Sequence, residues 1–338
     1  MAGSESLVTL SHGAGGKATR ELVEGLFADE LANEALAPLG DSALVDLPAG
    51  RVAVTTDAYV VKPLRFPGGD IGELAVNGTV NDLAVSGAHP LWLTAGFVLE
   101  EGLPVNELRA IAASMAAAAR RAGVAVVAGD TKVVERGRCD GLYVTTAGVG
   151  VVDGRTELAP ARVRPGDRVL LSGTLADHGM AVMIARGELA LEADVESDTA
   201  PVHELANALL GLGDGLRWMR DPTRGGLATA LNELAVESRL TVRLDETALP
   251  IRPEVAAACE ILGIDPLYVA NEGKLIAVVA PEAVDAAAAA LRADALGSDA
   301  AVVGTVEEAP DALVLLDTTL GGSRIVDMLV GDPLPRIC

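Results

Sequence analysis

Short apolar stretches suited to strands alternate along this chain with longer stretches of helical periodicity, and this alternation limits the fold more than any other feature. The first half reads as strand, helix, strand, helix, strand, strand. These elements are expected at residues 51–56, 72–86, 91–100, 104–122, 124–128 and 141–152. The order predicts an α/β fold in which helices are combined with mixed sheets.

The second half repeats this pattern after an interruption at residues 158–166, where two prolines break the periodicity. Strands are expected at residues 168–172, 274–280 and 301–306, and helices at 179–186, 201–211, 226–239 and 282–295. Prolines in the last eight residues exclude a helix there. We therefore expect an N-terminal α/β domain at residues 1–157, a C-terminal α/β domain at 158–330 and a flexible tail at 331–338.

The charge balance excludes several kinds of partner. With 26 basic and 48 acidic residues, the formal net charge is −22. A surface of this sign repels nucleic acid and anionic lipid, so neither is expected as a partner. The start of the chain lacks the basic and apolar segments of a signal peptide, and the apolar windows are short or broken by charge. We expect a cytoplasmic protein that does not enter membranes.

A glycine-rich segment, SHGAGGK at residues 11–17, precedes a helical stretch expected at 18–31. Gly13, Gly15 and Gly16 would let the backbone approach an anion, and a helix N-terminus adds partial positive charge. Of the four histidines, we consider only His12 a functional candidate, because it lies in this loop. The segment matches neither of the common phosphate-loop motifs, and a flexible turn with a helix cap explains it equally well.

Aspartates are found where the expected strands end or helices begin. The candidates are Asp41, Asp57, Asp82, Asp130 and Asp221, with Asn81 beside Asp82. Asp57 and Asp130 each follow an apolar strand, where α/β proteins place ligands. Carboxylate oxygens suit Mg²⁺ that bridges nucleotide phosphates. Taken singly, each of these residues fits a helix cap or a turn as well.

Two further loops carry groups that could neutralise charge or move protons: Lys132 follows Asp130, and Glu272 lies in the segment NEGK at residues 271–274. Either residue could instead belong to a solvated surface pair. The three cysteines, Cys139, Cys259 and Cys338, have no spacing typical of a disulfide framework or a zinc site.

Cys338 is the last residue of the sequence, and a thiol on a tail does not stabilise a core. Eight extended residues reach about 25 Å, enough to carry the thiol from the surface into a cleft. This predicts a reactive group. The alternatives are an incidental terminal residue or a crosslink between subunits.

Taken together, these motifs resemble the HypE family of hydrogenase maturation factors over essentially the whole chain. The resemblance is carried by SHGAGGK at 11–17, DIGELAVNGTVNDLAVSGA at 70–88, VAGDTKVV at 127–134, RDPTRGGLA at 220–228, NEGK at 271–274 and PRIC at 335–338. The wider superfamily contains aminoimidazole ribonucleotide synthetase and selenophosphate synthetase. The resemblance implies their two-domain ATP-binding fold and a homodimer formed through the N-terminal sheets.

The resemblance also implies an activity. A HypF-like carbamoyltransferase places a carbamoyl group on Cys338, and the chain then uses ATP and Mg²⁺ to dehydrate it to a thiocyanate. The cyano group passes to iron held by a HypC–HypD complex, as a ligand of [NiFe] hydrogenase. Glu272 is implied as the base, assisted by Lys132 and with His12 as a further catalytic candidate. The implied metal ligands are Asp41, Asp82 and Asp221, and the implied nucleotide-binding residues are Asp41, Asp57, Asn81, Asp82, Asp130, Asp221, Gly13, Gly15 and Gly16.

Two other functions would use the same sequence differently. A small-molecule synthetase of this fold would have no use for the tail, and would stay active without the thiol of Cys338. A non-enzymatic scaffold that presents its tail to partners would tolerate the loss of Asp82 or Glu272. Selenophosphate synthetase would be expected to carry a reactive cysteine or selenocysteine near its N-terminus, and here no cysteine precedes Cys139.

Overall fold

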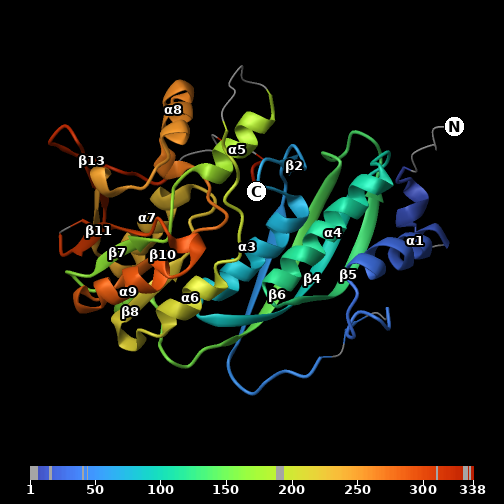
Figure 1. Ribbon diagram of the computed structural model, residues 1–338, viewed down its shortest axis with the longest axis horizontal. Helices are drawn as coiled ribbons and strands as arrows, with labels where there is room; N and C mark the ends of the chain where they lie inside the picture. The colour runs from blue at the N-terminus through green and yellow to red at the C-terminus, as the bar shows by residue number, and fades with distance from the viewer. Residues whose placement is uncertain are drawn as a thin grey trace.

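Two α/β halves lie side by side in the computed structural model, each built around its own main sheet (Figure 1). The structure describes residues 7–14, 17–39, 42–43, 45–187, 194–309, 311–329, 334 and 336–338. A short hairpin of β2 (Arg65–Phe66) and β3 (Gly69–Asp70) belongs to neither sheet. In the described part of the chain, no helix is both long and apolar enough to span a bilayer.

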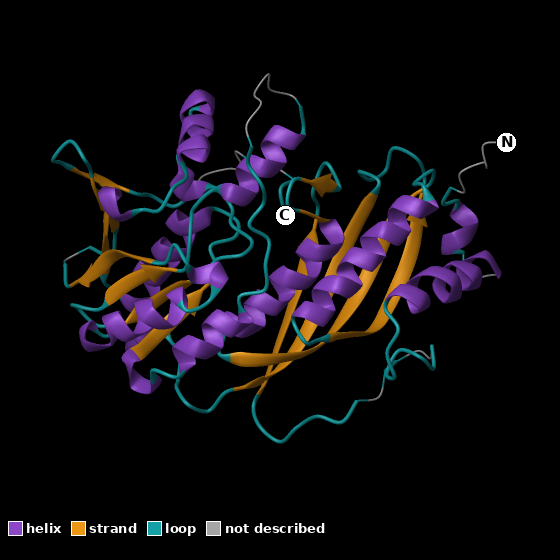
Figure 2. Ribbon diagram, viewed as in Figure 1, coloured by secondary structure: helices purple, strands orange, loops and turns teal. Residues whose placement is uncertain are grey.

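The N-terminal sheet has the strand order β1-β6-β4-β5. Its strands are β1 (Val52–Tyr59), β4 (Ala88–Glu100), β5 (Ala125–Val134) and β6 (Leu142–Val152). Helices α3 (Ile71–Val85) and α4 (Val105–Arg121) cover one face, as Figure 2 shows. On the opposite face the side chains of Val52, Val54 and Thr145 remain exposed.

Helix α3 is the central element of the molecule. The side chain of Asp70 caps its N-terminus by accepting hydrogen bonds from the backbone N–H groups of Gly72 and Glu73, at 2.8 and 3.0 Å. Nearly all of its residues are buried, because the sheet lies on one side and α4 and the C-terminal half lie on others. Most of its residues are apolar, and the polar side chains of Asn77, Thr79 and Asn81 are buried with them.

The segment before β1 packs along the outer strand β5. It contains η1 (Leu10–Gly13), α1 (Lys17–Leu22), a π-helical turn η2 (Val23–Phe27) and α2 (Ala28–Glu30). The rings of Phe27 and Phe97 pack at an angle of 34°, with centroids 4.5 Å apart, and join this segment to the sheet.

The C-terminal sheet has the order β13-β12-β9-β11-β7-β10-β8. Its strands are β7 (Arg168–Leu171), β8 (Leu216–Arg220), β9 (Thr241–Asp245), β10 (Ile276–Val279), β11 (Ala301–Glu307), β12 (Val314–Asp317) and β13 (Ser323–Ile325). The helices of this half are α5 (Asp177–Ala185), α6 (His203–Leu210), α7 (Gly226–Ser238), α8 (Pro253–Leu262) and α9 (Val284–Arg292). The expected mixed α/β class is confirmed.

Two expected strand ends are wrong. Strand β1 continues through Tyr59, which pairs with Val144, so Asp57 lies inside the strand. Strand β5 continues to Val134 in parallel pairing with β4, so Asp130 also lies inside a strand. Hydrogen bonds to the neighbouring strands extend β1 and β5 beyond their apolar residues. The hydrophobic pattern of the strand itself cannot predict this extension, because it depends on the partner strand.

Candidate active site

Four acidic side chains from distant segments face one small pocket, and Cys338 lines the same pocket. Asp57 comes from β1 and Asp82 from α3. Asp221 directly follows β8, and Glu272 lies in the loop before β10. The pocket is small, with a volume of about 30 Å³.

Hydroxyl groups on the first strand hold two of these carboxylates. Thr55 Oγ1 donates to Asp82 Oδ2 at 2.6 Å, and the Tyr59 hydroxyl donates to Asp57 Oδ2 at 3.1 Å. Burial raises the pKa of Tyr59 well above its usual value, and the charges of Asp57 and Glu272 raise it further, so this hydroxyl keeps its proton. A Cβ on Gly78 would lie 2.2 Å from the Tyr59 hydroxyl oxygen, so a side chain there would force α3 or the Tyr59 ring to move.

The carboxylates repel one another. Burial and the nearby charges of Asp82 and Asp57 raise the pKa of Asp221 to about 7. Burial and Asp57 also raise the pKa of Asp82. A cation would relieve this repulsion. Among the described residues, however, no group of three or more His, Cys, Asp or Glu side chains is arranged to hold a metal ion alone. The donor set suits Mg²⁺, which is usually held by one or two carboxylates together with phosphate oxygens and water.

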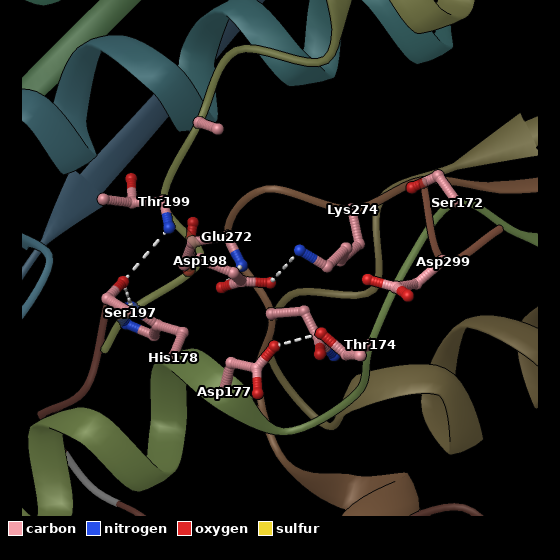
Figure 3. Close-up of polar contacts among 12 residues, drawn as sticks. Ser172, Thr174, Asp177, His178, Ser197, Asp198, Thr199, Glu272, Lys274 and Asp299 are labelled. Atoms are coloured by element: carbon pink, nitrogen blue, oxygen red, sulfur yellow. Dashed lines mark hydrogen bonds and ion pairs between the residues drawn. The ribbon is translucent and has the colours of Figure 1, made fainter. Parts of the chain in front are cut away.

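Glu272 is buried, and its carboxyl group forms a side-chain hydrogen bond with Cys338. Burial is the main reason that its pKa is raised well above the usual value, and Asp221, Asp198 and Asp57 add to the effect. A carboxylate with a raised pKa is a stronger base than a free one. The backbone N–H of Glu272 donates to Asp198 Oδ1 at 3.0 Å, and Asp198 forms a buried ion pair with Lys274 (Figure 3).

The same aspartates border an open cleft of about 770 Å³, which neither Cys338 nor Glu272 lines. Asp57, Asp82 and Asp221 lie on its wall, together with Arg220 and Arg224. A cleft of this size falls in the usual range for small-molecule sites. The three aspartates therefore line both the pocket of Cys338 and a larger space that could admit an anionic ligand.

The described end of the tail, residues 336–338, lies between the two halves of the molecule (Figure 1), and its backbone carbonyls accept hydrogen bonds from both. The carbonyl of Arg336 accepts hydrogen bonds from the backbone N–H of Lys62 at 3.1 Å and from the guanidinium of Arg186 at 2.6 Å. The Arg336 side chain donates to Asp140 Oδ1 at 3.1 Å. Arg336 has a φ of +60°, and the side chain of the next residue, Ile337, is buried. This local bend turns the last residues into the molecule.

Asn81 is buried beside the cluster, where its amide joins backbone groups. Its Nδ2 donates to the carbonyls of Ala200 and Glu272 at 3.0 and 3.1 Å, and its Oδ1 accepts from the Val202 N–H at 2.7 Å. In this arrangement the amide steadies the loop that carries Glu272. Its expected contact with a nucleotide stays a prediction.

Two other expected site residues, Asp130 and Lys132, lie on β5, which β6 and β4 separate from β1. Asp130 and Lys132 pair with Gly96 and Val98 and share their face of the sheet, opposite the helices. His12 Nδ1 accepts a hydrogen bond from the Thr9 backbone at 2.9 Å, as a local cap. A Cβ on Gly13 would lie 2.4 Å from the Val133 nitrogen. Asp41, Gly15 and Gly16 lie outside the described residues.

Several site residues escaped the sequence analysis. Tyr59 lies next to Asp57 in space, and Thr223 and Arg224 line the thiol pocket within the quoted RDPTRGGLA motif. His178 contacts the tail and Ser197 contacts His178, although the sequence singled out His12 among the histidines. Motif spacing could have indicated Arg224; nothing in the sequence links His178 to residue 337, because that contact joins positions 159 residues apart.

The comparisons with known proteins agree with this architecture. The N-terminal and C-terminal domain models of the AIR synthase related proteins match residues 39–152 and 164–316. The chain therefore has the fold of that class of two-domain proteins. Carbamoyl dehydratase HypE from Bradyrhizobium diazoefficiens is 55% identical, over 98% of this chain and 96% of its own length.

Two solved structures are similar to the present one. The crystal structure of hydrogenase maturation protein HypE in complex with ATP has a TM-score of 0.93 at 45% identity, and the match covers 98% of this chain and 99% of that one. A HypE–HypF complex contains a chain with a TM-score of 0.80 at 46% identity, with coverage of 91% and 99%. The chain belongs to the carbamoyl dehydratase HypE family, as its motifs led us to expect.

Proposed function

We propose that this chain is a hydrogenase maturation enzyme that uses ATP to dehydrate a carbamoyl group carried on Cys338 to a thiocyanate. The observation that carries the proposal is the hydrogen bond between Cys338 and buried Glu272, beside Asp57, Asp82 and Asp221. The HypE relatives are named carbamoyl dehydratases, and one HypE structure holds ATP. The thiocyanate is the source of the cyanide ligand of [NiFe] hydrogenase.

The reaction requires an amide oxygen to leave. Transfer of the γ-phosphoryl group of ATP to that oxygen gives a good leaving group and releases ADP. The amide nitrogen then loses its protons as the C–O bond breaks and the C≡N bond forms, and phosphate departs. The net change converts the thiocarbamate and ATP into thiocyanate, ADP, hydrogen phosphate and one proton. One amide proton ends on the phosphate and the other leaves through the base, so atoms and charge balance without an oxidant or reductant.

We assign the proton transfer to Glu272. Its raised pKa makes it a strong base when ionised, and its bond to Cys338 keeps it near the reacting carbon. Asp57, Asp82 and Asp221 would hold Mg²⁺ with the phosphates that enter by the open cleft. The metal would neutralise charge as the phosphoryl group moves. Arg220 and Arg224, on the same cleft, would add positive charge.

We further propose a homodimer formed through the uncovered face of the N-terminal sheet. Val52 and Val54 on β1 are exposed there, and a second copy would cover them. Asp130 and Lys132 share that face. They would complete a site with the second copy, together with Gly13, Gly15, Gly16, His12 and Asp41. Lys132 would then assist Glu272 across the interface.

The division into domains at residues 1–157 and 158–330 is also a proposal, supported by family models that end at 152 and resume at 164.

We propose a HypF-like carbamoyltransferase as the donor of the carbamoyl group, since a relative forms a complex with HypF. A HypC–HypD complex would receive the cyano group. The three cysteines, all among the described residues, form no disulfide.

Mass spectrometry of the terminal peptide tests this function. With carbamoyltransferase, carbamoyl donor and Mg-ATP, the peptide should gain a carbamoyl group and then lose water. Glu272→Gln should stop at the carbamoyl stage, and Cys338→Ala should show neither change. Addition of a chelator should also stop the reaction before loss of water. If the loaded wild-type peptide keeps its water with Mg-ATP present, the proposed activity is wrong.

A further inference from the structure

One short segment, residues 197–199, contacts both the backbone of Glu272 and the side chain of His178 (Figure 3). On one side, Asp198 Oδ1 accepts the Glu272 N–H at 3.0 Å. On the other, Ser197 Oγ lies 2.8 Å from Nδ1 of His178, whose Nε2 lies 2.6 Å from the carbonyl oxygen of Ile337. The segment thus reaches the backbone of Glu272 directly and the backbone of the tail through His178.

The hydrogen bonds from Ser197 through His178 to Ile337 form a relay, and the donor and acceptor of each bond are fixed. The Ile337 carbonyl can only accept, so His178 Nε2 must carry a proton. Ser197 Oγ already accepts from the Thr199 N–H at 3.1 Å, which leaves its own hydroxyl proton for Nδ1 of a neutral imidazole. Burial lowers the pKa of His178, which favours this neutral form. Each group in the series therefore has one partner on either side.

The surroundings leave the relay little room to move. His178 is fully buried, and the Phe66 ring meets its ring edge to face at 5.4 Å. A Cβ on Gly68 would lie 2.6 Å from the Ser197 carbonyl oxygen. A Cβ on Gly273 would lie 1.7 Å from the backbone carbonyl oxygen of Asp198. These glycines let the 197–199 segment pack directly against two backbones, so a shift of the segment would displace Glu272 and the tail together.

We propose that His178 is a positioning residue that, with Ser197, aligns the sulfur of Cys338 with Glu272 by holding the Ile337 carbonyl. The inference rests on the proposed dehydration at Cys338. Its physical basis is that Ile337 directly precedes Cys338, so a fixed carbonyl limits where the thiol can lie. When the tail leaves to meet a donor or an acceptor, the Nε2–H of His178 loses its partner. Return of the tail restores that bond and the alignment.

The test compares His178→Leu with His178→Gln, because glutamine retains an N–H donor while leucine does not. Both chains are loaded with a carbamoyl group, and loss of water after addition of Mg-ATP is followed in a single turnover. A misplacement of about 1 Å can slow a reaction by about 100-fold, so the leucine variant should be slower by about 10- to 100-fold. The glutamine variant should recover to within about threefold of wild type. ATP affinity should be unchanged in both.

A second measurement follows the tail without any turnover. Alkylation of unloaded Cys338 by iodoacetamide should be about two- to tenfold faster in His178→Leu, matching the loss of one ordinary hydrogen bond. Ser197→Ala removes the other end of the relay with little change in packing, and should show both effects in weaker form. It also keeps the proposal testable if the leucine variant does not fold.

Wild-type rates in a folded leucine variant, for both dehydration and alkylation, would overturn the proposal. It would equally be overturned if glutamine were as slow as leucine at the same melting temperature, because packing rather than the N–H donor would then matter. Failure of the proposed function itself looks different: the loaded wild-type chain would not lose water, while the alkylation rates would still report whether His178 holds the tail.

Discussion

The ammonium group of Lys274 lies 3.4 Å from Oδ2 of Asp198, and both side chains are almost excluded from solvent, with exposures of 9% and 1%. Oδ1 of the same Asp198 accepts the N–H of Glu272. The pair therefore stabilises the backbone of the proposed base. At 3.4 Å its attraction is that of two opposite charges more than of a short hydrogen bond.

Replacement of one partner of this pair should be costly. In Lys274→Met the carboxylate of Asp198 loses its counter-charge in a buried place, so the free energy of unfolding should fall by about 3–5 kcal/mol. Chemical denaturation at neutral pH measures this change. The double variant Lys274→Met with Asp198→Asn should recover much of the loss, because no buried charge remains. Equal stability of Lys274→Met and wild type would show that the pair is not needed.

Asp221 should make the protein less stable as the pH rises. A carboxyl group whose pKa is raised on folding, here from 3.8 to about 7, binds more protons in the folded state. Its unfavourable contribution is absent below pH 3.8 and grows until the pH passes 7. Asp221→Asn removes that contribution and should raise the free energy of unfolding by roughly 2–4 kcal/mol at pH 8.

Denaturation curves of both chains at pH 5 and pH 8, without nucleotide or metal, test this expectation. The difference between Asp221→Asn and wild type should be clearly smaller at pH 5 than at pH 8. If the stability difference between Asp221→Asn and wild type were larger at pH 5 than at pH 8, the expected direction of the pH dependence would be wrong. The variant should also bind Mg-ATP more weakly than wild type, since the proposed metal site loses one carboxylate.

The sequence predicted the fold well where the signal is local. Helix α3 was expected at 72–86 and spans Ile71–Val85, because a capping residue and an apolar pattern define it. Strands β8 and β9 were missed: both are short, and their pairing with distant strands stabilises them. Strands β1 and β5 proved longer than their apolar runs for the same reason.

The site was predictable by residue type, but not by position. Asp57, Asp82, Asp221, Glu272 and Cys338 were all candidates, and the structure brings them to one pocket. Spacing along the chain could not show this convergence, because the residues come from separate elements. Lys132 and Asp130 were candidates of equal strength, yet they lie on the opposite edge strand and the other face of the sheet.

A methyl group at position 78 should disturb the site from within α3. The Cβ of Gly78→Ala would lie 2.2 Å from the hydroxyl oxygen of Tyr59, which donates to Asp57. Either the helix or the ring must move, so we expect a loss of stability of about 1–3 kcal/mol and slower dehydration. Gly25→Ala is the control, because nothing lies within 4 Å of its Cβ position. Alanine there should be neutral or stabilising by about 0.5–1 kcal/mol, and equal effects at both positions would refute the steric argument.

The uncovered face of the N-terminal sheet gives the last prediction. Val54 is 70% exposed in the middle of edge strand β1, where a second copy would bury it. A lysine there would place a charge in an apolar interface. Because a two-fold interface uses the same surface of both copies, it would bury two such charges, and their desolvation is costly. Val54→Lys should therefore be monomeric at concentrations where wild type is dimeric, as measured by light scattering over a dilution series.

Val236→Lys is the matched control, because Val236 is similarly exposed, at 62%, but lies on α7 in the other half of the molecule. It should leave the oligomeric state unchanged. If Lys132 acts across the interface, Val54→Lys should also lose dehydration activity while its Cys338 still accepts the carbamoyl group. A monomeric wild type, or a monomeric variant of full activity, would mean that one chain holds the complete site and that Asp130 and Lys132 serve another purpose.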